Sequence, residues 1–299
     1  MKVSVIVPVY KDIRLSCLLD SLQEQTLGLD NFEVIVVDNG NSPEISDIVI
    51  KYKERLNIIY ITEGRKSSYI ARNTGIRAAS GEFLSFTDAD CVADPNWLYS
   101  LLEPFKDPLV GGVGGCILKN SPQIWIEKKT RDLAEGQKTT QKLAFTDLPF
   151  VVTANAAYRK ELVIKLGGFD EIFTSGGDVD LSWRTTLDGY KIVISSNAII
   201  YHNSRTTLRK YFKQYAGYTT GQVLLFKKHQ NYHKRKAFFH PYPFRGFIYI
   251  LKQLPKSVID FIQNKDSSEI QRLFFEFVMY SGILYGDLRG AIKYKILYI

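Results

Sequence analysis

Long apolar runs and paired cysteines are missing from this sequence, and each absence excludes a class of protein. A membrane-spanning helix needs about 18 uninterrupted apolar residues, and the longest candidate, residues 273–285, is broken by Glu276. The apolar start of the chain is too short for a signal peptide and lacks a small-residue cleavage site. Cys17, Cys91 and Cys116 are odd in number and widely spaced, so we expect three buried thiols and no disulfide framework. These absences together predict a cytoplasmic protein.

The composition is that of a globular chain with an excess of positive charge. Of the 299 residues, 45% are hydrophobic and 23% are charged, which is enough to bury a sizeable core. No low-complexity tract or fixed-period repeat stands out. The formal net charge of +8 suits an anionic partner, such as a nucleotide diphosphate, a nucleic acid or an acidic membrane surface.

The first hundred residues alternate between strand and helix signals. Four short apolar runs predict strands, at residues 3–7, 33–37, 57–61 and 82–86. Between them, apolar side chains recur at helical spacing, as in Leu15, Leu18, Leu19 and Leu22. Strands separated by helices predict an α/β fold with a mostly parallel sheet covered on both faces. In such sheets ligands bind at the carboxyl ends of the strands.

The later part of the chain changes character. Residues 111–115 are rich in glycine but lack the lysine of a phosphate loop, so they predict a glycine-rich strand or turn. Beyond residue 205 the chain becomes helical, basic and aromatic. We therefore predict an α/β domain over residues 1–205 and a helical region over residues 206–299.

The acidic turn after the fourth predicted strand is the first candidate site. Asp88 and Asp90 lie one residue apart there, and Asp38 directly follows the second strand, at the same edge of the sheet. Two such carboxylates can share Mg²⁺ or Mn²⁺, which completes its shell with substrate phosphate oxygens. A solvated acidic turn or a helix cap is the alternative explanation.

A second candidate site begins at two glycines, Gly176 and Gly177, which precede a predicted helix. Asp178 and Asp180 lie in its first turn, where either could cap free N–H groups. A carboxylate beside glycines also leaves room for a substrate, which is a favourable position for a general base. Asp180 could cap the helix while Asp178 faces the cleft.

Seven short motifs, taken in order, resemble those of family 2 glycosyltransferases with the GT-A fold. They are residues 5–10 (VIVPVY), 36–40 (VVDNG), 71–75 (ARNTG), 81–82 (GE), 87–90 (TDAD), 167–170 (GGFD) and 177–181 (GDVDL). The resemblance covers roughly residues 3–205. It implies that this part of the chain is the nucleotide-sugar-binding and catalytic domain.

The resemblance implies a nucleotide-sugar donor site. Pro8 and Tyr10 belong to its first motif, and Asp38 matches the acid that accepts the uracil N3–H, which favours UDP-sugars and dTDP-sugars. Asp88 would lie beside the ribose or sugar. Arg72 is a candidate contact to donor phosphate or base, although a surface salt bridge is an alternative role.

The resemblance also implies a metal and a base. Asp90 would hold Mn²⁺ or Mg²⁺ against the diphosphate, and His202 stands where related enzymes often place a further metal or diphosphate ligand. A half-buried histidine bonded to backbone is the alternative for His202. Asp178 matches the base that deprotonates the acceptor hydroxyl, with Asp180 and Arg184 on the acceptor side. One base without a protein nucleophile gives direct displacement with inversion.

Two departures from the family refine this prediction. The family usually shows Glu-Asp where this chain has Gly177 and Asp178, and the Gln-x-x-Arg-Trp motif of processive synthases is absent after Gln214. We therefore expect a non-processive hexosyltransferase acting in glycan or polysaccharide biosynthesis. The main alternative is a non-catalytic nucleotide- or carbohydrate-binding GT-A scaffold. A nucleotidyltransferase would need a glycine-rich loop at residues 8–12, which is missing.

The C-terminal region mixes cationic and aromatic side chains, especially over residues 226–252. Such a composition suits a membrane interface, where cations meet lipid phosphates and rings lie at headgroup level. It predicts a saccharide or lipid-linked saccharide acceptor and a location at the inner face of the plasma membrane. A solvated helical face is the alternative, and no nucleic-acid-binding motif accompanies the region.

Overall fold

The computed structural model describes residues 3–119, 140–202 and 207–298, which fall into two compact units. The first unit comprises residues 3–119, 140–143 and 147–202, and the second comprises residues 144–146 and 207–298. The predicted boundary between residues 205 and 206 lies outside the described residues. Each unit is described below by itself.

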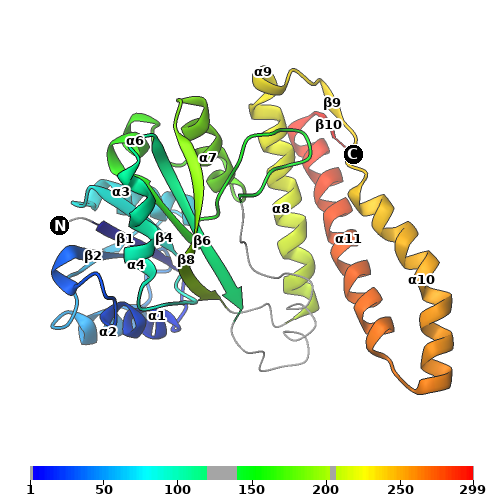
Figure 1. Cartoon of the computed structure of the whole chain (residues 1–299), viewed down its shortest axis with the longest axis horizontal. Helices are drawn as coiled ribbons and strands as arrows, with labels where there is room; N and C mark the ends of the chain where they lie inside the picture. The colour runs from blue at the N-terminus through cyan, green and yellow to red at the C-terminus, as the bar shows by residue number, and fades with distance from the viewer. Residues whose placement is uncertain (1–2, 120–139, 203–206, 299) are drawn as a thin grey trace. The chain divides into compact units, whose positions relative to one another are not determined.

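The described part of the first unit is built on an eight-stranded sheet in the order β3-β2-β1-β4-β7-β6-β8-β5 (Figure 1). Its strands are β1 (Val3–Val9), β2 (Phe32–Asp38), β3 (Ile58–Thr62), β4 (Phe83–Thr87), β5 (Cys91–Ala93), β6 (Val110–Lys119), β7 (Asn155–Arg159) and β8 (Lys191–His202). Only β7 and β5 among these strands run antiparallel to their neighbours. The predicted mostly parallel α/β fold is therefore confirmed.

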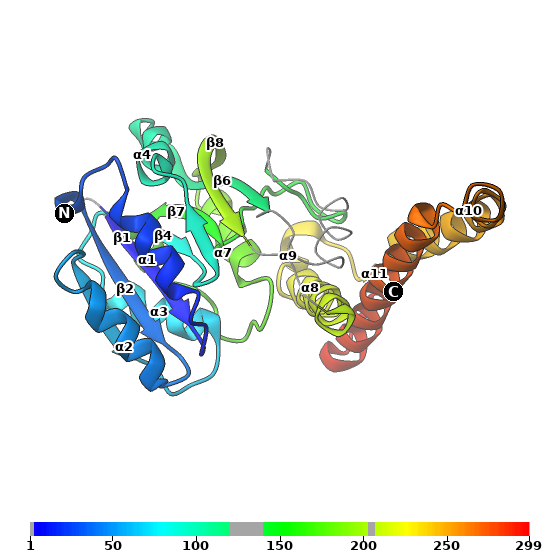
Figure 2. The same ribbon diagram turned by 90° about the horizontal axis from the view of Figure 1, so that it is seen from below.

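Helices cover both faces of this sheet (Figure 2). They are α1 (Leu15–Gln23), α2 (Pro43–Tyr52), α3 (Ser68–Ala78), α4 (Trp97–Leu102), α6 (Lys160–Lys165) and α7 (Gly177–Leu187), with the short 3-10 turns η1 (Leu29–Asn31) and η2 (Glu103–Lys106). Alternate β1 residues such as Val5 and Val7 share one core with α1 and α2. Ile6 points the opposite way and lies against Gly75 of α3. This alternation is why β1 is apolar at every position except Ser4.

Helical spacing correctly predicted which face of α1 is buried. Its four leucines, at positions 15, 18, 19 and 22, are fully buried. Cys17, however, is exposed, so the expectation of three buried thiols is wrong at this position. Because Cys17 follows Leu15 by two residues, it lies on the far side of the helix from the core. Cys91 and Cys116 are buried, as expected.

The second unit is helical over most of its described length. It contains α8 (Leu208–Lys228), α9 (Gln230–His233), α10 (Tyr242–Asn264) and α11 (Ser268–Tyr294), and β9 (Ala237–Phe238) pairs with β10 (Leu297–Tyr298). In both views α11 lies between α8 and α10 (Figures 1 and 2). Thr219 and Thr220 of α8 donate hydrogen bonds to the carbonyls of Ile283 and Gly286 in α11. Among the described residues, no helix combines the length and apolar character needed to cross a membrane.

Candidate active site

The candidate site lies where the parallel strands of the first unit end. Val9 of β1 is in register with Asp38 of β2, and β4 pairs with β1 on its other side. The side chains that follow these strands therefore leave the sheet at the same edge. Two further elements contribute to the site: α3, which covers one face of the sheet, and the N-terminal turn of α7.

Asp38 organises the turn after β2. Its carboxylate is fully buried and accepts hydrogen bonds from the backbone N–H groups of Gly40 and Ser42 at 2.8 and 2.7 Å. The hydroxyl of Tyr60 donates a third bond at 2.8 Å. A carboxylate offers about four acceptor positions, so these three bonds leave room for one more donor. The predicted contact with a uracil N3–H stays a prediction that this geometry permits.

The two donor-side residues of the first motif differ in exposure. Pro8 is half-buried within β1 beside Val37. Tyr10 follows the strand with 52% of its surface exposed, and Lys66 Nζ lies 5.9 Å from the centre of its ring. An exposed ring beside a cation is a surface on which a base or sugar can stack.

Arg72 connects the acidic turn to α3. Its side chain is 4% exposed, and Nη2 donates to Asp88 Oδ1 at 2.6 Å. The guanidinium also lies over the ring of Tyr69, 5.7 Å from its centre. An ion pair was one predicted role of Arg72, but the arginine of this pair is buried and not at the surface. Arg72 Nε is buried without a hydrogen-bond partner among the described residues.

Asp90 and His202 meet across two paired strands. Their side chains are mostly buried, and His202 Nε2 lies 3.4 Å from Asp90 Oδ1. With Cys91 they form a group whose potential ligand atoms all lie within 4.8 Å of one another. Arg14 Nη2 approaches Asp90 Oδ2 at 3.3 Å while it is held by Asp12.

The chemistry of this group fits a divalent cation held by Asp90 and His202. Burial raises the pKa of the Cys91 thiol; Cys91 is fully buried, whereas the side chains of Asp90 and His202 are partly exposed. The remaining carboxylate and imidazole form a donor set suited to Mn²⁺, and less so to Mg²⁺.

Asp178 lies in the first turn of α7 and is half-buried. Its Oδ1 accepts hydrogen bonds from the Val179 N–H at 3.0 Å and from the Tyr69 hydroxyl at 3.3 Å. Burial raises the pKa of the Asp178 carboxyl, an effect that the positive charge of Arg72 opposes. A carboxylate with a raised pKa accepts a proton more readily than an ordinary one, as a general base requires.

Gly177 makes room for the ring of Tyr69. A Cβ atom at this position would lie 2.9 Å from the Tyr69 Cζ atom, closer than such atoms approach in proteins. The space that a side chain at position 177 would take is thus occupied by an aromatic ring from α3. The ring also stacks on Phe169, with 5.5 Å between their centres.

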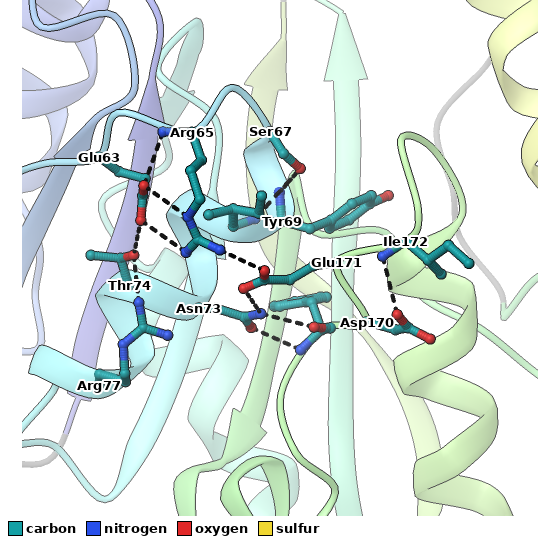
Figure 3. Close-up of polar contacts among 12 residues, drawn as sticks. Glu63, Arg65, Ser67, Tyr69, Asn73, Thr74, Arg77, Asp170, Glu171 and Ile172 are labelled. Atoms are coloured by element: carbon teal, nitrogen blue, oxygen red, sulfur yellow. Dashed lines mark hydrogen bonds and ion pairs between the residues drawn. The ribbon is translucent and has the colours of Figure 1, made fainter.

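Asn73 of α3 fixes the loop that leads into α7 (Figure 3). Its side chain donates to the Phe169 carbonyl at 2.8 Å and accepts the Phe169 N–H at 2.9 Å. Glu171 of the same loop accepts a hydrogen bond from Arg65 at 2.8 Å. These contacts tie the approach to Asp178 to the same helix that carries Arg72.

Asp180 and Arg184 form an internal pair. Asp180 is fully buried, and its Oδ2 accepts Arg184 Nε at 2.8 Å. The other guanidinium nitrogens donate to the carbonyls of Leu166 and Gly168 at 2.6 and 2.7 Å. These contacts shape the turn before α7. The predicted acceptor-side role of the pair stays a prediction.

Sequence analysis missed Tyr69, Asn73 and Arg14. Asn73 lies inside one of the recognised motifs, but the motif carries no information about its contact with Phe169, 96 residues away. For Tyr69 the available signal was its place three residues before Arg72, on the same helical face. Arg14 lies beside Asp90 only because the loop after β1 folds back.

Comparison with known proteins identifies the family. The family model described as "Glycosyl transferase family 2" matches residues 4–167. A pre-mycofactocin glycosyltransferase from Mycobacterium tuberculosis is 30% identical over 232 residues, covering 76% of this chain and 48% of that protein. The glycosyltransferase AglE from Haloferax volcanii is 30% identical over 218 residues, covering 71% of each chain. The chain therefore spans about half the length of the first of these relatives.

Solved structures share the fold. The mannosyltransferase PcManGT from Pyrobaculum calidifontis, in complex with GDP-Man and Mn²⁺, has a TM-score of 0.67 and 19% identity, covering 98% of this chain and 87% of its own. TarS from S. aureus, in complex with UDP, has a TM-score of 0.55 and 18% identity, covering 100% and 93%. At these identities the likeness establishes the GT-A type of architecture.

Proposed function

This chain belongs to glycosyl transferase family 2, and we propose from this membership that it is an inverting, metal-dependent hexosyltransferase. It moves a sugar from a nucleotide-diphosphate sugar, with UDP-sugars preferred, to an acceptor hydroxyl in glycan or polysaccharide biosynthesis. The observation that carries the proposal is the position of Arg72. It binds the donor-side Asp88 directly, and its charge acts on the pKa of Asp178.

Asp178 acts as the general base. Its carboxylate takes the proton of the acceptor hydroxyl while that oxygen attacks the anomeric carbon of the donor. The new C–O bond forms on one face of the sugar as the bond to the diphosphate breaks on the other, so the configuration inverts. Tyr69 holds the carboxylate through its 3.3 Å hydrogen bond and closes the space beside Gly177.

The donor is held at the ends of β1, β2 and β4. Asp38 accepts the uracil N3–H with its remaining acceptor position, and the pair of Pro8 and Tyr10 supports the base. Arg72 contacts donor phosphate or base from its place beside Asp88, and Asp88 lies beside the ribose or sugar. The solved neighbour with GDP-Man makes a guanine nucleotide the direct competitor to test.

Asp90 and His202 would hold the divalent cation, Mn²⁺ in preference to Mg²⁺. When bound there, the cation would neutralise charge that develops on the leaving diphosphate. Solved neighbours in complex with GDP-Man and Mn²⁺ or with UDP support a donor site of this kind. With a cation bound to Asp90, Arg14 would still have Asp12 as its hydrogen-bond partner.

The acceptor is a saccharide or a lipid-linked saccharide. The excess of positive charge in the chain and the basic C-terminal region support a cytoplasmic protein that meets the inner face of the plasma membrane. Asp180 and Arg184 support the acceptor side by fixing the turn from which α7 starts.

Calorimetric titration of UDP, dTDP and GDP, each with and without Mn²⁺, tests the donor site. We expect tight binding of a uracil or thymine nucleotide that requires Mn²⁺ and is lost in Asp90→Ala. Asp47→Ala is the matched control, because Asp47 is an exposed aspartate on α2. Absence of binding by every nucleotide would refute the proposal. Binding without transfer to any saccharide acceptor would favour the non-catalytic scaffold.

A further inference from the structure

The outward face of α10 carries a row of large apolar side chains. Ile248, Leu251, Val258, Ile259 and Ile262 are all exposed, with 70% exposure at Leu251 and 63% at Ile262. Successive members are three, seven, one and three residues apart, which keeps all five on one side of the helix. We call these five residues the α10 stripe. Contiguous apolar patches of this kind mark interaction surfaces in soluble domains.

The opposite face of α10 is already occupied. Gly246 lies against the ring of Tyr280 in α11, and Ile250 and Ser257 are buried. Figures 1 and 2 show α10 as the outermost of the three long helices of the second unit. Within the described part of that unit, the α10 stripe therefore faces away from the packed helices.

Cations border the α10 stripe on one side. Arg245, Lys252 and Lys256 are exposed and follow one another at intervals of seven and four residues, which keeps them on one flank. Within the sequence of α10 the single carboxylate is Asp260, one turn after Lys256. The helix thus carries a net positive charge along one edge of its apolar face.

We propose that the α10 stripe docks on an anionic lipid bilayer, with α10 lying in the plane of the interface. An apolar face bordered by lysine and arginine is the arrangement with which amphipathic helices enter the headgroup region. The apolar side chains enter the acyl boundary, and the three cations reach lipid phosphates. This proposal deepens the membrane contact in the proposed function and is independent of sugar transfer, because it involves neither Asp90 nor Asp178.

Charge favours a bilayer over an antiparallel second copy of this chain. Two copies docked antiparallel through the α10 stripe would bring the same flanks together, so each cation row would meet its counterpart. Like charges at that distance repel. Lipid phosphates instead neutralise the row, and each cation near an anionic surface adds to the attraction.

Flotation of the full chain with vesicles tests the proposal. One set of vesicles contains phosphatidylcholine alone, and the other contains phosphatidylcholine with a minor fraction of phosphatidylglycerol. We expect the protein to float with the anionic vesicles only, and the bound fraction to fall as salt is added.

Two pairs of variants identify the surface. Leu251→Glu and Ile262→Glu should each lower partitioning about tenfold or more, since each replaces an apolar side chain that would enter the acyl boundary with a carboxylate. Ile164→Glu is the matched control, because Ile164 on α6 is 57% exposed and lies in the other unit; it should bind like the wild type. Lys252→Gln and Lys256→Gln should each lower binding about fivefold on anionic vesicles.

Nucleotide affinity and thermal unfolding of each variant separate this proposal from the proposed activity. A Leu251→Glu protein that binds nucleotide normally but no longer floats supports lipid docking, whichever reaction the chain catalyses. Three results would overturn it: no flotation of the wild type, equal flotation of Leu251→Glu, or a wild-type dimer in light scattering that Leu251→Glu converts to a monomer. The last would assign the α10 stripe to a second copy.

Discussion

Replacing Arg184 by lysine tests whether this residue supports the turn before α7 or contacts the acceptor. The guanidinium donates three hydrogen bonds, to Asp180, Leu166 and Gly168. A lysine ammonium keeps the charge but cannot reach the three acceptors with the geometry of the guanidinium fork. Arg184→Lys should therefore lose about two of the bonds.

The magnitude follows from the charge of the donor. A hydrogen bond to a charged group contributes about 1.5–3 kcal/mol, and the Asp180 end of the pair is fully buried while Arg184 is about one-fifth exposed. Water can replace part of what is lost at the exposed end, so we expect a loss of about 3 kcal/mol. For a unit of this size the melting temperature should fall by about 6–12 °C.

Differential scanning calorimetry of the full chain measures the effect. The unfolding transition whose melting temperature rises when nucleotide and Mn²⁺ are added belongs to the first unit. Asp188→Asn is the control, because Asp188 directly follows α7 and pairs with Lys165, whose side chain is 64% exposed; its cost should stay below about 1 kcal/mol. An Arg184→Lys protein that melts like the wild type and has a raised KM for acceptor would refute the structural role.

Two further variants test the site, and a third tests the core of the first unit. Asp178→Asn should abolish transfer and raise the melting temperature at pH 8, because burial raises the pKa of this carboxyl and its charged form lowers stability above that pKa. The gain in melting temperature should shrink as the pH falls toward the ordinary carboxyl range, and a gain that does not change with pH would contradict this. Tyr69→Phe removes a hydrogen-bond donor to the Asp178 carboxylate, which should raise the pKa of that carboxyl and move the acid limb of the pH–kcat/KM profile to higher pH. An unchanged acid limb would show that the Tyr69 hydroxyl does not act on the base. Trp97→Phe should cost about 2–3 kcal/mol in urea unfolding, because the Trp97 Nε1–H bonds to the buried Asn155 Oδ1 at 2.8 Å, and a loss below about 0.5 kcal/mol would mean that water replaces it.

Local patterns in the sequence predicted much of the first unit. The apolar runs located β1 to β4 within one or two residues, because strands buried on both faces, such as β1 and β2, are mostly apolar. A second rule, that parallel strands end on the same side of a sheet, placed Asp38 and Asp88 at one edge. Both predictions depend on features that neighbouring residues share.

Contacts between distant segments were beyond such patterns. Tyr69 and Asp178 are separated by 109 residues and meet only because the loop before α7 packs on α3. The antiparallel insertion of β7 beside β4 was equally hidden, because the direction of a buried strand leaves no mark on its composition. The spacing of apolar residues along the sequence shows which face of an element is buried. Which distant residues pack against that face depends on the packing of the whole unit.

The close fit of Tyr69 against Gly177 makes the two positions interdependent during evolution. Since a side chain at position 177 would collide with the ring, Gly177→Glu can be tolerated only after Tyr69 has become smaller. Loss of the ring in a glycine background would instead open a void. Substitutions here are therefore expected to be epistatic, so that homologues with an acid at position 177 carry a small residue at position 69 and those with glycine keep the aromatic ring.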